Sequence, residues 1–265
     1  METRDFIGVH PTDDPLRWRF RVTPRLCSFQ ENLFGGVGLA AATEALEFVT
    51  GRPLLWASAQ YLSFAKLNQV IDLEVKLVVE GHSTTQARVI ASTDDLEILS
   101  INAALGRRST PGAGSFAERP MVAPPEECPP RTFRLSPEST INENIEMRVA
   151  AGRSWDALDG TANPLGRSAL WARLPAVDHI TAGTLAVLGD FVPYGMGQAL
   201  GMKAGGSSLD NSIRVVRLVP TEWVLLDIRI HAIHAGFGHG LVHLWADDGT
   251  LMATASQTAV LRYRG

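Results

Sequence analysis

The fold is decided by the stretch LFGGVGLAAATEALEFVT, residues 33–50. From residue 37 onward, its only polar side chains are Thr43, Glu44, Glu47 and Thr50. A helix that is apolar almost all round has to be enclosed by other protein, because it has no side suited to water. The segments that follow have the pattern of strands, so we expect a central helix wrapped by an antiparallel sheet.

Gly35 and Gly36 stand where this helix begins. They carry no side chains, so they leave backbone N–H groups open to whatever docks there. No Lys-Ser or Lys-Thr pair follows them, which argues against a phosphate-binding loop of the ATP type. Taken alone, the pair is most simply a tight turn that lets the helix start.

The rest of the chain predicts a repeat of this arrangement. Strands are expected at 18–22, 55–64, 70–79, 83–91 and 97–105, and again at 141–149, 169–174, 209–217, 223–232, 240–246 and 251–263. A second apolar helix is expected at 183–200, kinked at Pro193. Each half is thus a helix followed by four strands in meander order. We therefore expect fold class α+β, with two tandem helix-plus-antiparallel-sheet repeats.

Residues 109–130 differ in character from both halves. Six prolines and two glycines fall within them, which is typical of a linker or a long strap rather than a packed element. We therefore expect an N-terminal domain at 1–108, this Pro-rich linker, and a C-terminal domain at 131–265.

Composition narrows the class of protein. Of the 265 residues, 45% are hydrophobic and 20% charged, as in soluble globular proteins. The net charge of −4 argues against a nucleic-acid binder, which usually carries a basic face. Two distant cysteines, no apolar leader at the N-terminus and no apolar run of about 20 residues indicate a cytoplasmic protein without a membrane span.

Gln257 is the most informative single residue. It lies in a strand whose other residues on the same face are Leu251, Ala253, Ala255, Ala259 and Leu261. A carboxamide in that row must find partners, since an unpaired buried amide costs about 1–3 kcal/mol. Bonding to local backbone and a place in a functional site are equally compatible with this pattern.

Other polar residues carry weaker signals. Asp210 begins a strand and, taken alone, is a turn or cap residue. Asp190, the only charged residue in the second helix, is expected to be structural. His231 and His234 would point to opposite faces of a strand, and no HExxH motif accompanies them, so we expect no metal. There is no Gly-x-Ser-x-Gly, so a serine hydrolase of the α/β type is unsupported.

Several motifs together resemble the acyl-CoA thioesterase II family. They are NLFGG at 32–36 before an Ala-rich helix, SLD at 208–210, EWVL at 222–225, DGTLMATASQ at 248–257 and VLR at 260–262. The resemblance extends from about residue 22 to residue 262. It implies a double hotdog fold with one continuous sheet, which agrees with the repeat, and the C-terminal domain as carrier of the catalytic residues.

The family uses an Asp, a Thr or Ser, and a Gln to hold and activate the hydrolytic water. By motif, these positions fall on Asp210, His231 and Gln257. His231 departs from the family pattern, although an imidazole can position or deprotonate water. The resemblance implies that Asp210 is the base and that the other two orient the water.

The same resemblance implies an acyl-CoA substrate, no cofactor, and hydrolysis to free fatty acid and CoA. Phe34, Gly35 and Gly36 would bind substrate, with the Gly36 N–H polarising the thioester carbonyl and the acyl chain running along the apolar helix. The CoA phosphates need a cation, and the candidates are Arg52, Arg107, Arg167 and Arg262. Hotdog proteins commonly associate through their sheets, so a homo-oligomer is expected.

Two other functions stay open at this point. A double-hotdog enoyl-CoA hydratase would need an Asp-x-Asn-Pro-x-His segment, and residues 159–164, DGTANP, have different spacing, with Gly166 where a His could follow. A non-catalytic acyl-CoA-binding protein is the second alternative, and the His231 departure favours it.

Overall fold

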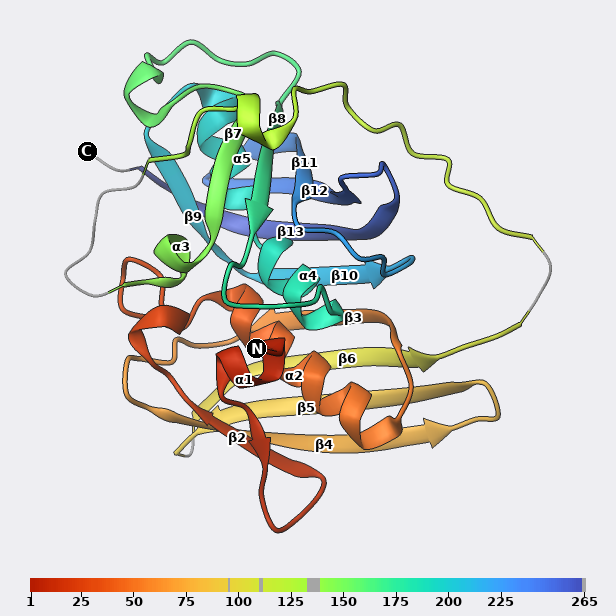
Figure 1. Ribbon diagram of the computed structural model, residues 1–265. Helices are drawn as coiled ribbons and strands as arrows, with labels where there is room; N and C mark the ends of the chain where they lie inside the picture. Colours follow the sequence, from red (N-terminus) through yellow and green to blue (C-terminus); the bar gives the residue numbers. More distant parts are fainter. Residues whose placement is uncertain (95, 110–111, 133–138, 264–265) are drawn as a thin grey trace.

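The computed structural model describes residues 1–94, 96–109, 112–132 and 139–263. Within these residues, thirteen strands form one antiparallel sheet. The helices α2 and α4 lie side by side on its inner face, as Figure 1 shows. The predicted α+β fold of two helix-plus-sheet repeats in one continuous sheet is confirmed.

The N-terminal half contributes the lower part of Figure 1. Its elements are α1 (Thr3–Ile7), β1 (His10–Pro11), β2 (Arg17–Arg21), the 3-10 turn η1 (Pro24–Leu26), α2 (Gly35–Thr50), β3 (Leu54–Tyr61), β4 (Val70–Glu80), β5 (Thr84–Thr93) and β6 (Leu96–Gly106). The predicted first helix therefore includes the glycine pair itself, and it ends at Gly51, which adopts the left-handed conformation with φ 61°.

The C-terminal half repeats this plan. Its elements are η2 (Pro125–Glu127), α3 (Ile141–Asn144), β7 (Glu146–Ala151), η3 (Trp155–Ala157), β8 (Arg167–Arg173), α4 (Ala182–Leu188), α5 (Val192–Leu200), β9 (Ala204–Ser208), β10 (Asp210–Val215), β11 (Val224–His234), β12 (Phe237–Ala246) and β13 (Leu251–Tyr263). The strand expected at 141–149 begins instead with the helical turn α3, because Thr140 and Glu143 form a capping box.

The strand order makes the repeat visible. It runs β1-β2-β4-β5-β6-β3-β10-β13-β12-β11-β8-β7, with β9 paired to β13. The two halves meet where β3 pairs with β10, and the hydroxyls of Ser58 and Ser212 lie 2.7 Å apart across this junction. Each half thus places its own helix against its own strands, and the two helices meet at the centre.

α2 is buried along most of its length. Its residues from Gly36 to Ala42 are buried, and Leu39, Ala40 and Ala41 are fully covered. A Cβ at Gly36 would lie 2.8 Å from the Ala186 carbonyl oxygen of α4. The course of the acyl chain along this helix stays a prediction, and at Gly36 neighbouring backbone already fills the space beside it.

The second helix differs from the predicted one. Instead of one kinked helix at 183–200 there are two, α4 and α5, separated by residues 189–191. Pro193 lies in the first turn of α5, where its missing N–H costs no hydrogen bond, so it starts a helix rather than bending one. The interruption places the side chain of Asp190, which stays buried, at the pocket between the two halves.

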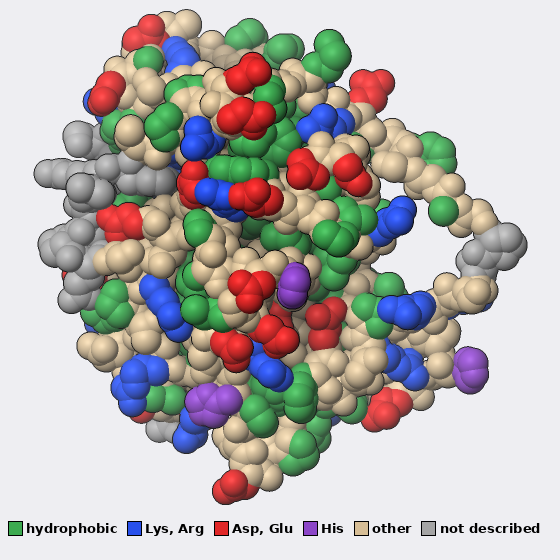
Figure 2. Space-filling model, viewed as in Figure 1, with side chains coloured by type: hydrophobic (Ala, Val, Ile, Leu, Met, Phe, Trp, Pro, Cys, Tyr) green, Lys and Arg blue, Asp and Glu red, His purple; other side chains and the backbone are tan. Residues whose placement is uncertain are grey.

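Residues 117–128 of the Pro-rich segment pack on the C-terminal half, whereas residues 110–111 lie outside the described residues. The segment leaves β6 at the right of Figures 1 and 2. Trp171 donates its indole N–H to the Ala123 carbonyl at 2.9 Å, and Cys128 joins a small apolar cluster with Trp171 and Trp245. On the face in Figure 2, acidic and basic side chains are interspersed rather than gathered into one basic patch. Among the described residues, no helix combines the length and apolarity needed to cross a bilayer.

Candidate active site

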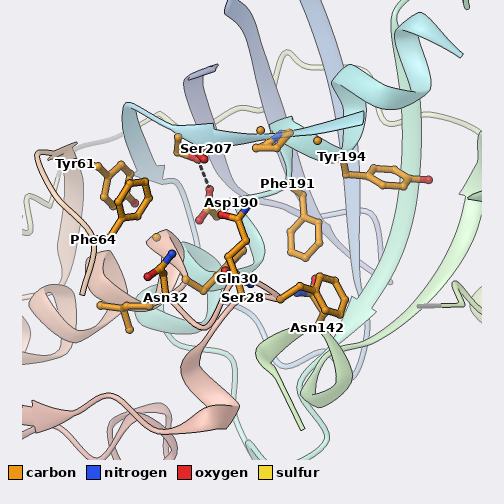
Figure 3. A pocket seen from close by; sticks show the side chains of 18 of the residues that line it. Ser28, Gln30, Asn32, Tyr61, Phe64, Asn142, Asp190, Phe191, Tyr194 and Ser207 are labelled. Carbon is orange, nitrogen blue, oxygen red and sulfur yellow. Dashed lines mark hydrogen bonds between the residues drawn. The ribbon is translucent and has the colours of Figure 1, made fainter. Parts of the chain in front are cut away.

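A pocket of about 200 Å³ lies between the two halves. The N-terminal half lines it with the loop before α2, the end of β3 and the start of β6, and the C-terminal half with α3, α5 and β9. Figure 3 shows Asp190 in the middle of this pocket, with Tyr61 and Phe64 on one side and Phe191 and Tyr194 on the other. The pocket is therefore aromatic along its walls, with a carboxylate inside it.

Asp190 is bound from three directions. Its Oδ2 accepts the Gly36 N–H at 2.6 Å, and its Oδ1 accepts the Ser208 hydroxyl at 3.1 Å and a hydrogen bond from Gln257 Nε2. The side chain is only 5% exposed. Its contacts come from α2, β9 and β13, so the carboxylate is fixed by both halves of the molecule.

Burial sets the protonation of this carboxylate. It raises the Asp190 pKa from 3.8 to about 6, while the hydrogen bonds from Gln257, Gly36 and Ser208 act in the opposite direction. The start of α2, whose helix dipole favours negative charge, also lies at this carboxylate. A carboxyl group that titrates near pH 6 is suited to take up and release a proton close to neutral pH.

Gln257 holds the side chains of Asp190 and Ser208 in place. It is 3% exposed, and its Oε1 accepts the Val192 N–H at the start of α5 at 3.1 Å. This acceptance fixes which end of the amide faces Asp190, so Nε2 donates to the carboxylate and to Ser208 Oγ, the latter at 3.1 Å. The carboxamide in an apolar row thus pairs with a carboxylate and a hydroxyl, and not with backbone alone.

Ser208 ends β9, directly before the strand pairing passes to β10. Ser208 pairs with Ala259 of β13, while Ser212 pairs with Ser256. At this break between β9 and β10, the Ser208 hydroxyl lies beside Asp190. An Asp, a Ser and a Gln, the residue types implied by the family resemblance, therefore meet as Asp190, Ser208 and Gln257.

Asp210 does not lie in this cluster. It is half-buried at the first position of β10, opposite Gln60 of β3, and its Oδ1 accepts the Thr258 backbone N–H at 2.7 Å. It is not among the residues that line the pocket. The geometry thus gives Asp210 the part of a strand-start residue that holds backbone, which is the simpler of the two interpretations its sequence position allowed.

His231 is also outside the cluster. It is exposed, at a shift in register between Ile230 and Ala232 where β11 pairs with β12. Gln257 pairs with Gly240, and Gly240 pairs with Ile230, whose side chain packs inward against α5. Laying the family motif along β11 therefore puts the hydroxyl position on a residue that does not line the pocket, whereas Ser208 does line it.

The substrate-binding residues named from the sequence have a mixed outcome. Phe34 and Gly35 line the pocket. Gly36 does not offer a free N–H to a carbonyl, because that N–H already donates to Asp190. At Gly35 a Cβ would lie 2.9 Å from Asp190 Oδ2 and 3.0 Å from the Tyr61 ring, so both glycines are needed for close approach.

One signal could have found Asp190. Gly189-Asp190 precedes Pro193 within three residues, and a proline in the first turn marks the start of a new helix. A charged residue in the break between two apolar helices has to meet a partner, as Gln257 does in its strand. No local pattern, however, identifies Gly36 as that partner, because 154 residues separate them.

Of the four cationic candidates, Arg262 lines a depression beside the pocket. Its guanidinium donates to Ser207 Oγ at 2.9 Å, and this depression shares Gln30 and Gly206 with the main pocket. Arg52 instead donates to the carbonyls of Gly81 and His82 in the N-terminal half. Within the described residues, no group of three or more His, Cys, Asp or Glu side chains could hold a metal ion.

Comparisons with known proteins show the family of this chain. Residues 125–261 match the family model described as acyl-CoA thioesterase C-terminal domain. A "putative thioesterase" from Novosphingobium aromaticivorans is 33% identical, with a TM-score of 0.85 over 96% of this chain and 98% of that one. No curated protein matches the chain significantly.

More distant solved structures share the fold. A hot dog fold protein from Alicyclobacillus acidocaldarius, 18% identical, has a TM-score of 0.85 over 99% of this chain and 98% of that one. The tesB protein of Mycobacterium avium subs. paratuberculosis, 17% identical, has a TM-score of 0.79 over 98% of each chain. From the family model, which covers more than half of the chain, and the 33% identical relative, the chain belongs to the acyl-CoA thioesterase C-terminal domain family.

Proposed function

We propose that this protein hydrolyses acyl-CoA thioesters with water that Asp190 activates, without a covalent intermediate. The observation that carries the proposal is the contact of Asp190 with Gln257 and Ser208 inside an aromatic-walled pocket. Membership of the acyl-CoA thioesterase family supports the same reaction class. This assignment replaces Asp210 and His231 and keeps Gln257.

The proposed reaction begins with a water at the free lone pairs of Asp190. As the water oxygen attacks the thioester carbon, its proton passes to Asp190, and the carbonyl π electrons move to the oxygen. When the tetrahedral intermediate collapses, the C–S bond breaks and the CoA sulfur takes the proton from Asp190. The products are the carboxylic acid and CoA thiol, and the enzyme returns to its starting state.

The surrounding groups each have a part in this scheme. Gln257 holds Asp190 through one end of its amide and is itself fixed by the Val192 N–H, so the carboxylate has one orientation. The N-terminal turn of α2, with Phe34 and Gly35 at the pocket wall, favours the negative charge that develops on the carbonyl oxygen. Arg262 is the proposed contact for a CoA phosphate at the pocket mouth.

Release of free thiol from acyl-CoA tests the reaction. We expect turnover with at least one member of a series from acetyl-CoA to palmitoyl-CoA that includes benzoyl-CoA, and loss of turnover in Asp190→Asn. Reaction in ¹⁸O-water should place the label in the product acid and none in the protein after a single turnover. Replacement of Arg262 by Ala should raise KM and leave kcat unchanged.

Two results would contradict the proposal. Tight binding of every acyl-CoA with no thiol release would favour the non-catalytic binding protein. Loss of the crotonyl-CoA absorbance without thiol release would favour the hydratase, although its candidate residue Asp159 lies in an exposed loop and pairs with Arg153 at 2.8 Å.

The homo-oligomer expected from the fold is also a proposal. Leu55, Val79 and Ile90 on the strands of the N-terminal half are large apolar side chains that stay exposed in the single chain, which supports it. Light scattering during gel filtration tests it, and a measured mass equal to the 28.7 kDa of one chain would overturn it.

A further inference from the structure

Seven of the 28 residues that line the pocket are aromatic. They are Phe29, Phe34, Tyr61, Phe64, Trp155, Phe191 and Tyr194. Figure 3 shows Tyr61 and Phe64 on one side of Asp190 and Phe191 and Tyr194 on the other. A ligand group that reaches the carboxylate therefore has ring faces and ring edges on both of its sides.

These rings are held in place. Phe34 and Phe191 come from different halves, with centroids 6.0 Å apart and ring planes inclined by 52°. The Arg131 guanidinium lies 4.6 Å from the centroid of the Tyr194 ring. Tyr61 packs against Gly35, where a Cβ would come within 3.0 Å of its ring. Walls fixed in this way favour a flat, rigid guest, because neither partner loses much freedom on binding.

The pocket is also small. Its volume of about 200 Å³ is little more than the apolar cavity of about 150 Å³ that holds one benzene molecule. It adjoins a depression of about 350 Å³ through Gln30 and Gly206, and that depression is more polar than apolar. Growth toward α2 is blocked, because a Cβ at Gly38 would already lie 2.8 Å from the pocket residue Leu99. Toward α5, the Gln198 amide and the Arg153 backbone close the wall through two hydrogen bonds of 2.8 and 2.9 Å.

We propose that the acyl group bound here is compact and aromatic, of benzoyl or phenylacetyl size, and not a long alkyl chain. This inference rests on the proposed thioester hydrolysis and adds the class of acyl group. The aryl ring would lie between the Tyr61 side and the Phe191 side of the pocket, with the thioester carbon at Asp190.

The first test compares kcat/KM for benzoyl-, phenylacetyl-, hexanoyl- and palmitoyl-CoA, each below its micelle concentration. We expect the aryl thioesters to exceed palmitoyl-CoA by at least about 10-fold, the scale on which pocket shape discriminates acyl groups. Equal or faster hydrolysis of palmitoyl-CoA would overturn the inference and leave the hydrolytic function intact. No thiol release from any of the four would instead contradict the proposed function.

Binding tests the acyl class independently of turnover. The probes are S-phenacyl-CoA and S-hexadecyl-CoA, thioethers that cannot be hydrolysed, titrated into the wild-type chain by calorimetry. The inference predicts that the aryl thioether binds more tightly, even if hydrolysis were absent. Tighter binding of the hexadecyl thioether would overturn it.

Two variants locate the preference. In Phe191→Leu and in Phe34→Leu we expect kcat/KM for benzoyl-CoA to fall about 5-fold, from the loss of ring contacts, and the value for hexanoyl-CoA to change less than 2-fold. Phe116→Leu is the matched control, since Phe116 lies in the Pro-rich segment and is 97% exposed. Equal losses for both substrates in the pocket variants would overturn an aromatic preference.

Discussion

The two copies of the central helix differ in one respect that decides where the site lies. α2 runs unbroken from Gly35 to Thr50, whereas its counterpart is divided into α4 and α5 around Asp190. At one end of the helix pair, Asp190 meets the glycine pair that starts α2. At the other end, Glu44 of α2 meets Gly183 in the first turn of α4 and accepts the Thr181 hydroxyl at 2.8 Å.

A carboxylate thus lies against a glycine at a helix start at both ends, although Asp190 accepts the glycine N–H and Glu44 accepts the Thr181 hydroxyl. Burial raises both pKa values to about 6. Only Asp190, however, lines the pocket. Glu44 is surrounded by the hydroxyls of Thr181, Thr184 and Thr3, which bond to one another. The duplicated fold therefore has one catalytic candidate, Asp190, and one structural carboxylate, Glu44. They differ because the helix pair borders the pocket at the Asp190 end and a cluster of threonine hydroxyls at the Glu44 end.

The largest effect expected is on Asp190→Asn. The amide cannot take the proton of the attacking water, so kcat should fall about 1000-fold, within the range for removing a general base. KM should change little, because the ring walls remain. Thiol release with benzoyl-CoA measures both constants.

Asp210→Asn is the matched control for that substitution. Its contact with the Thr258 N–H lies outside the pocket, and an amide oxygen can still accept it, so we expect kcat within about 3-fold of wild type. The reverse outcome, with Asp210 essential and Asp190 dispensable, would return the base to the residue that the sequence motif suggested.

Gly36→Ala should have the next largest effect. The new Cβ would meet the Ala186 carbonyl and the Val187 Cα at 2.8 and 2.9 Å, and backbone cannot move aside as a side chain can. We expect kcat to fall about 100-fold through displacement of Asp190, and the free energy of unfolding to fall by about 1–3 kcal/mol. Urea denaturation and the thiol assay measure the two losses.

Gly183→Ala makes the comparison at the other end of the pair. There the nearest atoms belong to the Glu44 side chain, which can move, so stability should fall less than in Gly36→Ala and kcat should stay near wild type. Equal loss of activity in both variants would mean that general helix packing, and not the position of Asp190, accounts for the first result.

Ser208→Ala should reduce kcat about 10-fold and also move the pH profile. The wild-type profile should rise through pH about 6, because Asp190 acts as a base only when it is deprotonated. Loss of the Ser208 hydroxyl removes a hydrogen bond that favours the charged form, so the midpoint of the rise should shift to higher pH. A profile with an unchanged midpoint would contradict the assignment of this limb to Asp190.

Glu44→Gln should leave kcat unchanged and affect stability alone. The folded pKa of Glu44 is raised from 4.5 to about 6, so the native state holds this proton more tightly than the unfolded state does. Wild-type stability should therefore fall as pH rises from about 4.5 to 6, by at most about 2 kcal/mol. Urea midpoints at pH 4.5 and 7 should show a smaller difference in the variant, and an equal difference in both would contradict this linkage.

The sequence predicted the architecture well for a physical reason. An apolar helix and alternating strands are local patterns, and residues 37–50 can be stable only inside a sheet. Gln257 was recognisable in the same way, because a carboxamide in an apolar row needs a partner. Asp190, in contrast, was expected to be structural. Its contact with Gly36 depends on how the two halves pack, and no local sequence pattern contains that information.

His231, on which the family motif placed the hydroxyl position, gives the smallest predicted effect. A motif carried along a strand without gaps cannot foresee a register shift, and β11 shifts between Ile230 and Ala232. His231 is exposed and its strand face leads away from Gln257, so His231→Thr should change kcat/KM less than about 2-fold, as surface substitutions usually do. His239→Thr is the control for a histidine on the same sheet. In the wild type, the His239 ring forms a hydrogen bond of 3.1 Å with the Thr258 hydroxyl. A large loss in His231→Thr alone would mean that the imidazole reaches the reacting water, and that the pocket between the halves is not the whole site.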